Sequence, residues 1–161
     1  MAGTRTLVVL RHAKSAWPEG TPDAQRPLAE RGRRDAPAAG RWLRKHIGDI
    51  DLVVCSSALR ARQTWELVAG KLKAVPAFRE DERVYEASAE TLVKVARELP
   101  DEARTVVVVG HNPGLEDVVA LLSGQHRELK TSTIAVLQGE GAWSGAGPRW
   151  ASLHTLATPR G

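Results

Sequence analysis

The stretch TLVVLRHA, residues 6–13, decides the fold, because a run of apolar, β-prone residues ends abruptly on an arginine and a histidine. The apolar run predicts a strand over residues 6–11. Arg11 and His12 can lie there simply because the strand reaches the surface, or because the strand end carries a reactive site. The rest of the sequence decides between these two interpretations.

Further strand-like runs follow along the chain, and apolar residues at helical spacing separate them. These runs cover residues 51–55, 105–109, 133–137 and 150–156. The first three are rich in Val and Ile without regular alternation, which is typical of strands covered on both faces. Strands that alternate with helices indicate an α/β domain with a mainly parallel central sheet in three α/β/α layers.

Helix signals stand at three further places. Helical periodicity spans residues 61–72. Ser88 and Pro100 are expected to start and stop a second helix, and Asn112 is expected to cap a third that ends at Gly124, with proline in its first position.

The segment 30–47 is also helical in character, but Gly32, Pro37 and Gly40 interrupt it. Proline is tolerated in the first turn of a helix and breaks its interior. We therefore expect this helix to begin near Asp35, so that the proline falls in its opening turn.

The C-terminal part of the chain predicts a different kind of connection. Residues 139–150, GEGAWSGAGPRW, join the last two strand candidates through a Gly-rich segment typical of an antiparallel hairpin with a long tip. No internal repeat or long linker divides the chain. We expect a single domain over residues 1–161.

Composition limits the classes of function. Of 161 residues, 42% are hydrophobic and 26% charged, which is ordinary for a globular domain. The single Cys55 cannot form an internal disulfide, and no apolar run suits a signal peptide or a membrane span, so we expect a cytoplasmic protein without membrane partners. The formal charge of +4 favours an anionic partner. Apart from five Trp, stacking aromatics are scarce, and nucleic acid is not expected.

Three predicted strands run directly into reactive side chains. Arg11 and His12 end the first, Arg60 follows the second in the opening turn of a helix, and His111 follows the strand at 105–109. The carboxyl ends of strands in an open parallel sheet form the ligand crevice. Two histidines and two arginines are therefore expected in one pocket.

This set of side chains favours phosphoryl transfer. A histidine can act as a nucleophile, arginine forks match phosphate oxygens, and helix N-termini supply further donors for an anion. Arginines would repel a divalent cation, and no carboxylates flank the histidines at ligand spacing, so no metal site and no cofactor are expected.

Three ordered blocks carry a resemblance to a known family. LRHAKS at residues 10–15, SSALRARQT at 56–64 and VVVGHNP at 107–113 resemble the signature blocks of the histidine phosphatase (phosphoglycerate mutase-like) superfamily. The short length, together with RHAKSAW and RPLAERGRRDAP, is most similar to the SixA-type phosphohistidine phosphatases. The resemblance implies a phosphoglycerate mutase-like fold.

The resemblance also implies roles for the four shared residues. His12 would attack phosphorus and carry the phosphoryl group, Arg11 and Arg60 would hold its oxygens, and His111 would donate to it before water hydrolyses the intermediate. Attack requires a neutral His12 ring whose other nitrogen is held by an acceptor, for which we expect a backbone carbonyl. The two arginines favour that neutral form, because like charge disfavours imidazolium.

The chain departs from larger family members in the stretch 78–88, where they present a carboxylic acid. Glu86 is the candidate proton donor here, although an exposed carboxylate with a structural role is the more common interpretation of such a residue. A site without an acid suits phosphohistidine, because a phosphoramidate is protonated on its own nitrogen and leaves more easily than an alkoxide. The short insertion also predicts a shallow, open pocket.

Several neighbours are candidate substrate-binding residues. Lys14 and Ser15 follow the nucleophile and either contact the phosphate or line the rim. Arg26 is placed to reach back to the site, and Asn112 either contacts substrate or only caps its helix. Ser57 is expected to cap the helix that carries Arg60.

These observations predict a hydrolase that cleaves phosphohistidine on a protein through a covalent phosphohistidine intermediate without a metal. The first alternative is a phosphatase of small phosphorylated metabolites. A second alternative is a catalytically inactive module that binds phosphorylated ligands through the same pocket.

Overall fold

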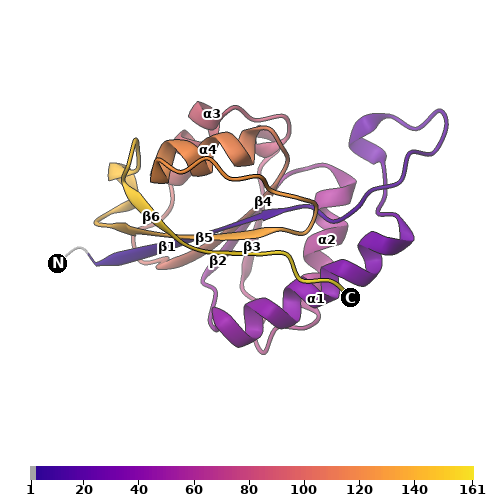
Figure 1. Ribbon diagram of the computed structural model, residues 1–161, viewed down its shortest axis with the longest axis horizontal. Helices are drawn as coiled ribbons and strands as arrows, with labels where there is room; N and C mark the ends of the chain where they lie inside the picture. The colour runs from indigo at the N-terminus through magenta and orange to yellow at the C-terminus, as the bar shows by residue number, and fades with distance from the viewer. Residues whose placement is uncertain (1–2) are drawn as a thin grey trace.

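One sheet of six strands forms the centre of the computed structural model, which describes residues 3–161 (Figure 1). The strand order is β3-β2-β4-β1-β5-β6. The first four strands run parallel to one another, β5 pairs antiparallel with β1, and β6 pairs antiparallel with β5. This confirms the predicted mainly parallel sheet and the C-terminal hairpin. The strands are β1 (Thr4–Arg11), β2 (Leu52–Cys55), β3 (Ala77–Glu80), β4 (Thr105–Gly110), β5 (Ile134–Glu140) and β6 (Ala151–Ala157).

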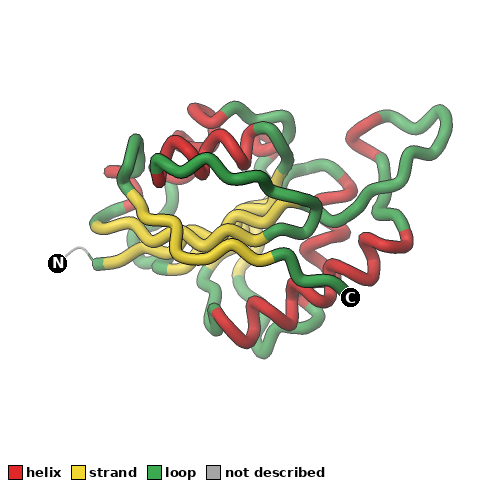
Figure 2. The backbone as a smooth tube through the Cα atoms, viewed as in Figure 1, coloured by secondary structure: helices red, strands yellow, loops and turns green. Residues whose placement is uncertain are grey.

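Helices cover both faces of this sheet, as the three-layer prediction requires (Figure 2). One pair packs together on one face and a second pair on the other. Three short 3₁₀ turns complete the chain. The helices are α1 (Glu30–His46), α2 (Leu59–Ala69), α3 (Ala89–Arg97) and α4 (Gly114–Ser123), and the turns are η1 (Asp23–Gln25), η2 (Glu82–Val84) and η3 (Trp143–Gly145).

Strand β1 contributes residues to the hydrophobic cores on both faces of the sheet. Its residues Val8 and Leu10 are buried with α1 and α2, whereas Leu7 and Val9 are buried with α3 and α4. Successive side chains of a strand point to opposite faces, so an apolar residue at every position is required where both faces are covered. The continuous apolar run that precedes the Arg-His pair is explained by this burial.

Helix α1 begins at Glu30, so the prediction of a start near Asp35 was wrong. Pro37 lies inside the helix. The residues on either side of the proline, Ala36 and Ala38, are buried. At the start of the helix, Ala29 N donates to Lys14 O at 2.9 Å, and a Cβ on Gly32 would lie 2.1 Å from that same oxygen. This close approach ties the first turn of α1 to the segment that follows β1.

The expected caps were partly wrong. Ser88 accepts from the Thr91 amide, which confirms it as the N-cap of α3, and Gly124 ends α4 in the left-handed region. Asn112 does not cap α4, because its side-chain amide donates to Leu129 O at 2.8 Å, and the helix starts two residues later. Ser57 does not cap α2 either, since the amide of Ala58 is bound by the neighbouring serine.

Strand β3 is an edge strand that the sequence analysis missed. All four of its residues are exposed, and main-chain pairing with β2 holds it in the sheet.

In the described part of the chain, no helix combines the length and apolar character needed to cross a membrane.

Candidate active site

The histidines of the first and third sequence blocks lie side by side at the carboxyl edge of the sheet. Strand β1 pairs in parallel with β4, in a register that sets Arg11 opposite Gly110. His12 and His111 are the next residues along each strand, and their ring centroids are 5.1 Å apart. The parallel register therefore creates the histidine pair, as the sequence predicted.

His12 is held as a neutral ring with one nitrogen free. Its Nδ1 lies 2.7 Å from Ala13 O, which fixes the proton on Nδ1 and leaves the Nε2 lone pair available. This carbonyl is the backbone acceptor that was expected. Burial lowers the pKa of His12 to about 3, although the Ala13 contact opposes the shift, and the positive charges of Arg60 and Arg11 lower it further.

His111 is also neutral and is oriented by a serine. Its Nε2 lies 2.8 Å from the Oγ of Ser56, which in turn accepts the amide of Ala58 at 3.1 Å. Burial lowers the pKa of His111 to about 4, and Arg60 adds to the effect. Its Nδ1 is buried and has no hydrogen-bond partner within residues 3–161.

Each of the two predicted arginines is fixed on one side. Arg11 Nη1 donates to Leu129 O at 2.9 Å, while its Nε is buried without a partner in the described residues. Arg60 is only 7% exposed, and both of its Nη atoms donate to Asp23. The unpartnered donors of Arg11 and His111 belong to the residues expected to hold a phosphoryl group.

Sequence reasoning missed Asp23, which lies in η1 at the rim. Its Oδ1 accepts from Arg26 Nη1 at 2.8 Å, and its Oδ2 accepts from the Tyr85 hydroxyl at 2.5 Å. These two hydrogen bonds hold the pKa of Asp23 well below its usual range, and Arg60 contributes to the same shift. The only local signal for this cluster is the i,i+3 spacing of Asp23 and Arg26.

Arg26 is buried and brings Ser15 into the same cluster. Its Nη2 donates to Ser15 Oγ, its Nε donates to Ala16 O at 3.1 Å, and its guanidinium stacks 3.3 Å above the Trp17 ring. The loop between β1 and α1, which carries these residues, projects from one end of the molecule (Figure 1).

The remaining candidates lie nearby but differ in setting. Asn112 shares the acceptor Leu129 O with Arg11, which places its side chain beside the pocket. Lys14 is exposed. Glu86 has a left-handed backbone with φ of 55°, and its charge helps Asp23 and burial to raise the pKa of Tyr85 to about 12.

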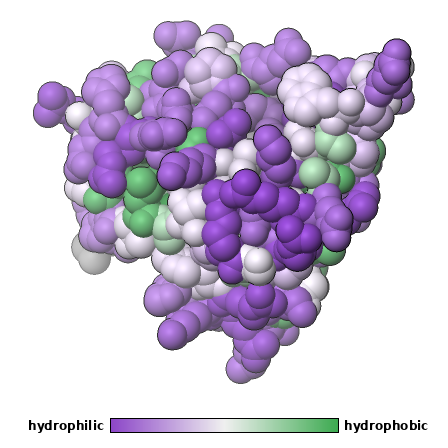
Figure 3. Space-filling model, turned by 45° about the vertical axis from the view of Figure 1, so that its right-hand side comes forward, coloured by the Kyte–Doolittle hydropathy of each residue, from purple (hydrophilic) through white to green (hydrophobic). Residues whose placement is uncertain are grey.

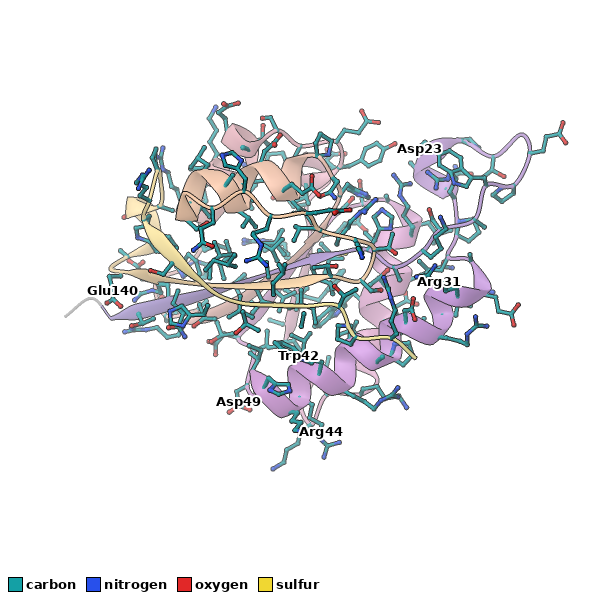
Figure 4. The ribbon with its side chains drawn as sticks, in the orientation of Figure 1. Asp23, Arg31, Trp42, Arg44, Asp49 and Glu140 are labelled. Carbon is teal, nitrogen blue, oxygen red and sulfur yellow. The ribbon has the colours of Figure 1, made fainter. Side chains whose placement is uncertain are left out.

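The two central side chains of the site are buried. His12 and Arg60 are each 7% exposed, and the Asp23–Tyr85 contact joins two loops beside them. Figure 4 labels Asp23 on the loop that projects at this end of the molecule. The space-filling view, which turns this end forward, shows a largely hydrophilic face (Figure 3). The loop before α1 contributes Asp23 and Arg26 to the edge of the site.

The site combines three guanidinium groups, two neutral imidazoles and one carboxylate. Such a pocket is cationic and rich in forked donors, which suits an oxyanion. Within residues 3–161, no three His, Cys, Asp or Glu side chains are grouped as metal ligands.

Comparisons with known proteins agree with the motifs. The family model described as "Histidine phosphatase superfamily (branch 1)" matches residues 7–104. An uncharacterized protein of Mycobacterium tuberculosis is 41% identical over 94% of this chain and 100% of its own length.

Solved structures show the same fold. A Nakamurella multipartitia structure assigned as phosphohistidine phosphatase SixA has a TM-score of 0.86 and 33% identity, and the match covers 98% of each chain. The protein histidine phosphatase SixA complexed with tungstate has a TM-score of 0.83 and 25% identity, covering 96% of this chain and 97% of that one.

Proposed function

This chain belongs to the histidine phosphatase superfamily, which supports phosphatase activity, and we propose that it hydrolyses phosphohistidine on a protein through a phosphoryl group carried by His12. The observation that carries this proposal is the pair of neutral imidazoles 5.1 Å apart, flanked by two anchored arginines. We also propose that residues 1–161 form one domain and act in the cytoplasm.

In the first step, Nε2 of His12 attacks phosphorus while Ala13 O retains the proton on Nδ1. The new N–P bond forms as the bond to the leaving imidazole breaks, and the proton of that leaving group comes from its own ring nitrogen or from water. Ala13 O then stabilises the positive charge that the phosphorylated His12 ring acquires.

The arginines and His111 stabilise charge on the phosphoryl oxygens. Arg11 and Arg60 use the N–H groups that the protein leaves unbound, and His111 donates from Nδ1, whose proton is fixed when Nε2 accepts from the Ser56 hydroxyl. Preorganised donors of this kind are the main source of catalysis in phosphoryl transfer. We propose that the two guanidinium groups and the His111 N–H take the place of a metal.

In the second step, water attacks the phosphorus of phosphorylated His12. Inorganic phosphate leaves, and the His12 ring returns to its neutral form with the proton on Nδ1. Lys14, Ser15, Arg26 and Asn112 are proposed to line the phosphate side of the pocket, and Glu86 remains the candidate for moving a proton to or from water.

Nitrogen-linked phosphate is favoured because neither Asp23 nor Tyr85 has a readily donated proton at neutral pH. Asp23 has a pKa well below its usual range, and the pKa of Tyr85 is raised to about 12. An alkoxide leaving group needs a positioned acid, whereas a protonated phosphoramidate does not. The likeness to SixA structures, one of them complexed with the oxyanion tungstate, supports the same substrate class.

A small phosphorylated metabolite is the second candidate substrate. The 7% exposure of His12 and the closed rim favour a substrate that fits inside the pocket. A phosphorylated side chain on a protein must reach the same depth, so the rim would have to admit it.

A substrate panel distinguishes the two candidates. We expect faster turnover of a phosphohistidine protein and of phosphoramidate than of phosphoserine, sugar phosphates and nucleotides, and no turnover by His12→Ala. His126→Ala, at an exposed histidine, is the matched control and should keep full activity. Equal or faster turnover of small phosphoesters would refute the phosphohistidine assignment, and binding without turnover would leave only the inactive module.

A further inference from the structure

Asp23 occupies one whole edge of the Arg60 guanidinium. Its main-chain carbonyl accepts from Nη1 at 2.7 Å, and its Oδ2 accepts from Nη2 at 3.0 Å. A guanidinium carries five N–H groups in a fixed plane, so two bonds to one residue fix the orientation of that plane. The N–H groups that point away from Asp23 are the ones left for a phosphoryl group.

Arg11 offers a direct comparison. Its Nη1 donates to a main-chain carbonyl, that of Leu129, and its buried Nε has no partner among the described residues. Both arginines are thus held from one side by the protein. The anchor of Arg11 is a neutral carbonyl behind the strand ends, whereas the anchor of Arg60 is partly a carboxylate in the projecting loop.

The same carboxylate ties together three separate segments. Arg26 donates to Oδ1 from within the loop, and Tyr85 donates to Oδ2 from the far side of the rim. The Tyr85 ring also lies edge-on to His111, with centroids 5.7 Å apart and planes at 81°. Asp23 therefore connects Arg60, Arg26 and the wall beside the second histidine.

The carboxylate of Asp23 offsets part of the positive charge of the site. It pairs with Arg26 and Arg60, whereas the charged neighbours of Arg11 are Glu116 and Glu128. A phosphoryl group carries about two negative charges at neutral pH, so it is attracted by the guanidinium groups that this pairing orients. The Asp23 side chain is 42% exposed, yet its carboxylate stays ionised. It therefore acts by charge and hydrogen bonding and does not supply a proton.

We infer that Asp23 is a positioning residue of this active site, which holds the Arg60 fork in the orientation required by the transition state of phosphoryl transfer. The inference rests on the proposed function, because it assumes transfer to His12. Without Asp23, Arg60 can still attract a bound phosphate through its charge. Only a guanidinium held in a fixed orientation can bond the flattened phosphoryl group of the transition state, so loss of Asp23 should lower kcat more than it weakens ground-state binding.

The test compares Asp23→Asn with Asp49→Asn, which makes the same charge change at an exposed site at the other end of the molecule (Figure 4). Turnover of phosphoramidate gives kcat and KM, and calorimetry gives the affinities for inorganic phosphate and for orthovanadate, a transition-state mimic. Each variant is also melted, which shows whether it folds.

For Asp23→Asn we expect kcat to fall roughly 10- to 100-fold, the range of a lost hydrogen bond to a charged group. Vanadate affinity should weaken in parallel, while phosphate affinity changes by less than about threefold. Asp49→Asn should match the wild type in every readout. Unchanged kcat, or an equal loss of phosphate and vanadate binding, would overturn the inference.

Tyr85→Phe keeps the inference testable where Asp23→Asn does not fold. It removes one donor from Oδ2, and we expect a fall in kcat of about three- to tenfold with the same selective loss of vanadate affinity. A Tyr85→Phe enzyme equal to the wild type would overturn the inference in that case. A wild-type protein that binds neither phosphate nor vanadate would instead refute the proposed function itself, and the inference with it.

Discussion

The floor and the rim of the pocket are built by different means. The floor, with Arg11, His12 and His111, lies at the ends of two paired strands and is held by main-chain carbonyls and one serine. The rim is held by side-chain contacts of Asp23 with Arg60, Arg26 and Tyr85. The floor is therefore fixed by sheet register, whereas the rim depends on ionised groups from separate segments.

Replacing the nucleophile is the strongest test of the floor. His12→Ala should lower kcat by at least about 10³-fold, because no other group in the pocket is placed to form the covalent intermediate. Steady-state turnover of phosphoramidate measures the effect. Activity within tenfold of the wild type would show that water attacks the substrate directly.

Exchanging the arginines compares floor with rim. Arg11→Lys and Arg60→Lys keep a charge but lose the fork, and each should lower kcat roughly 100-fold. The two should differ in thermal stability, since Lys at position 60 leaves a partly exposed carboxylate at the rim, and Lys at position 11 leaves a buried carbonyl in the floor. We expect the larger fall in melting temperature for Arg11→Lys. The reverse order would contradict the contrast between the two regions.

Ser56→Ala tests the side-chain support of the floor. The variant removes the partner of His111 Nε2, so the ring is free to turn and its tautomer is no longer fixed. We expect kcat to fall about tenfold, with little change in KM. Ser57→Ala is the matched control at the neighbouring residue, which forms no cap, and it should retain wild-type kcat.

The smallest expected effect is the loss of folding stability in acid, which is slight near neutral pH and grows as the pH is lowered. The folded-state pKa values of His12 and His111, about 3 and about 4, lie below the unfolded value of 6.5, so the unfolded chain binds more protons between these values. The free energy of unfolding should therefore fall as pH drops from about 6.5 toward 3. Denaturant melts at several pH values measure how steeply the free energy of unfolding changes with pH, and this dependence should be shallower for His12→Gln than for the wild type. An equal dependence would mean that His12 binds its proton as readily in the folded protein as in the unfolded chain.

The sequence was sufficient to predict most of the floor and little of the rim. Apolar runs indicated both β1 and β4, the second as a strand covered on both faces, and parallel pairing then brought the two histidines together. Cys55 at the end of β2 is buried, and burial raises the pKa of its thiol to about 12. Asp23 and Tyr85 meet only in the folded chain, so no local pattern predicts their contact.

The errors in the helices have the same physical cause. Pro37 would break an isolated helix, yet α1 runs through it with Ala36 and Ala38 on either side of the proline buried. Asn112 is a residue type that often caps helices, but its side-chain amide donates to Leu129 O, which Arg11 also contacts. Strand β3 has no apolar run because it lies at an exposed edge of the sheet. Tertiary contacts thus replaced local preferences at the places nearest the pocket.

The central claim, that His12 carries the phosphoryl group, is tested most directly by trapping that intermediate. The protein is mixed with excess phosphoramidate, quenched rapidly in alkali to preserve phosphohistidine, digested and mapped by tandem mass spectrometry. We predict one phosphorylated residue, His12, with the modification absent from His12→Ala and retained in His126→Ala. Phosphate on another residue, or no phosphoenzyme in a protein that turns over the substrate, would contradict the mechanism.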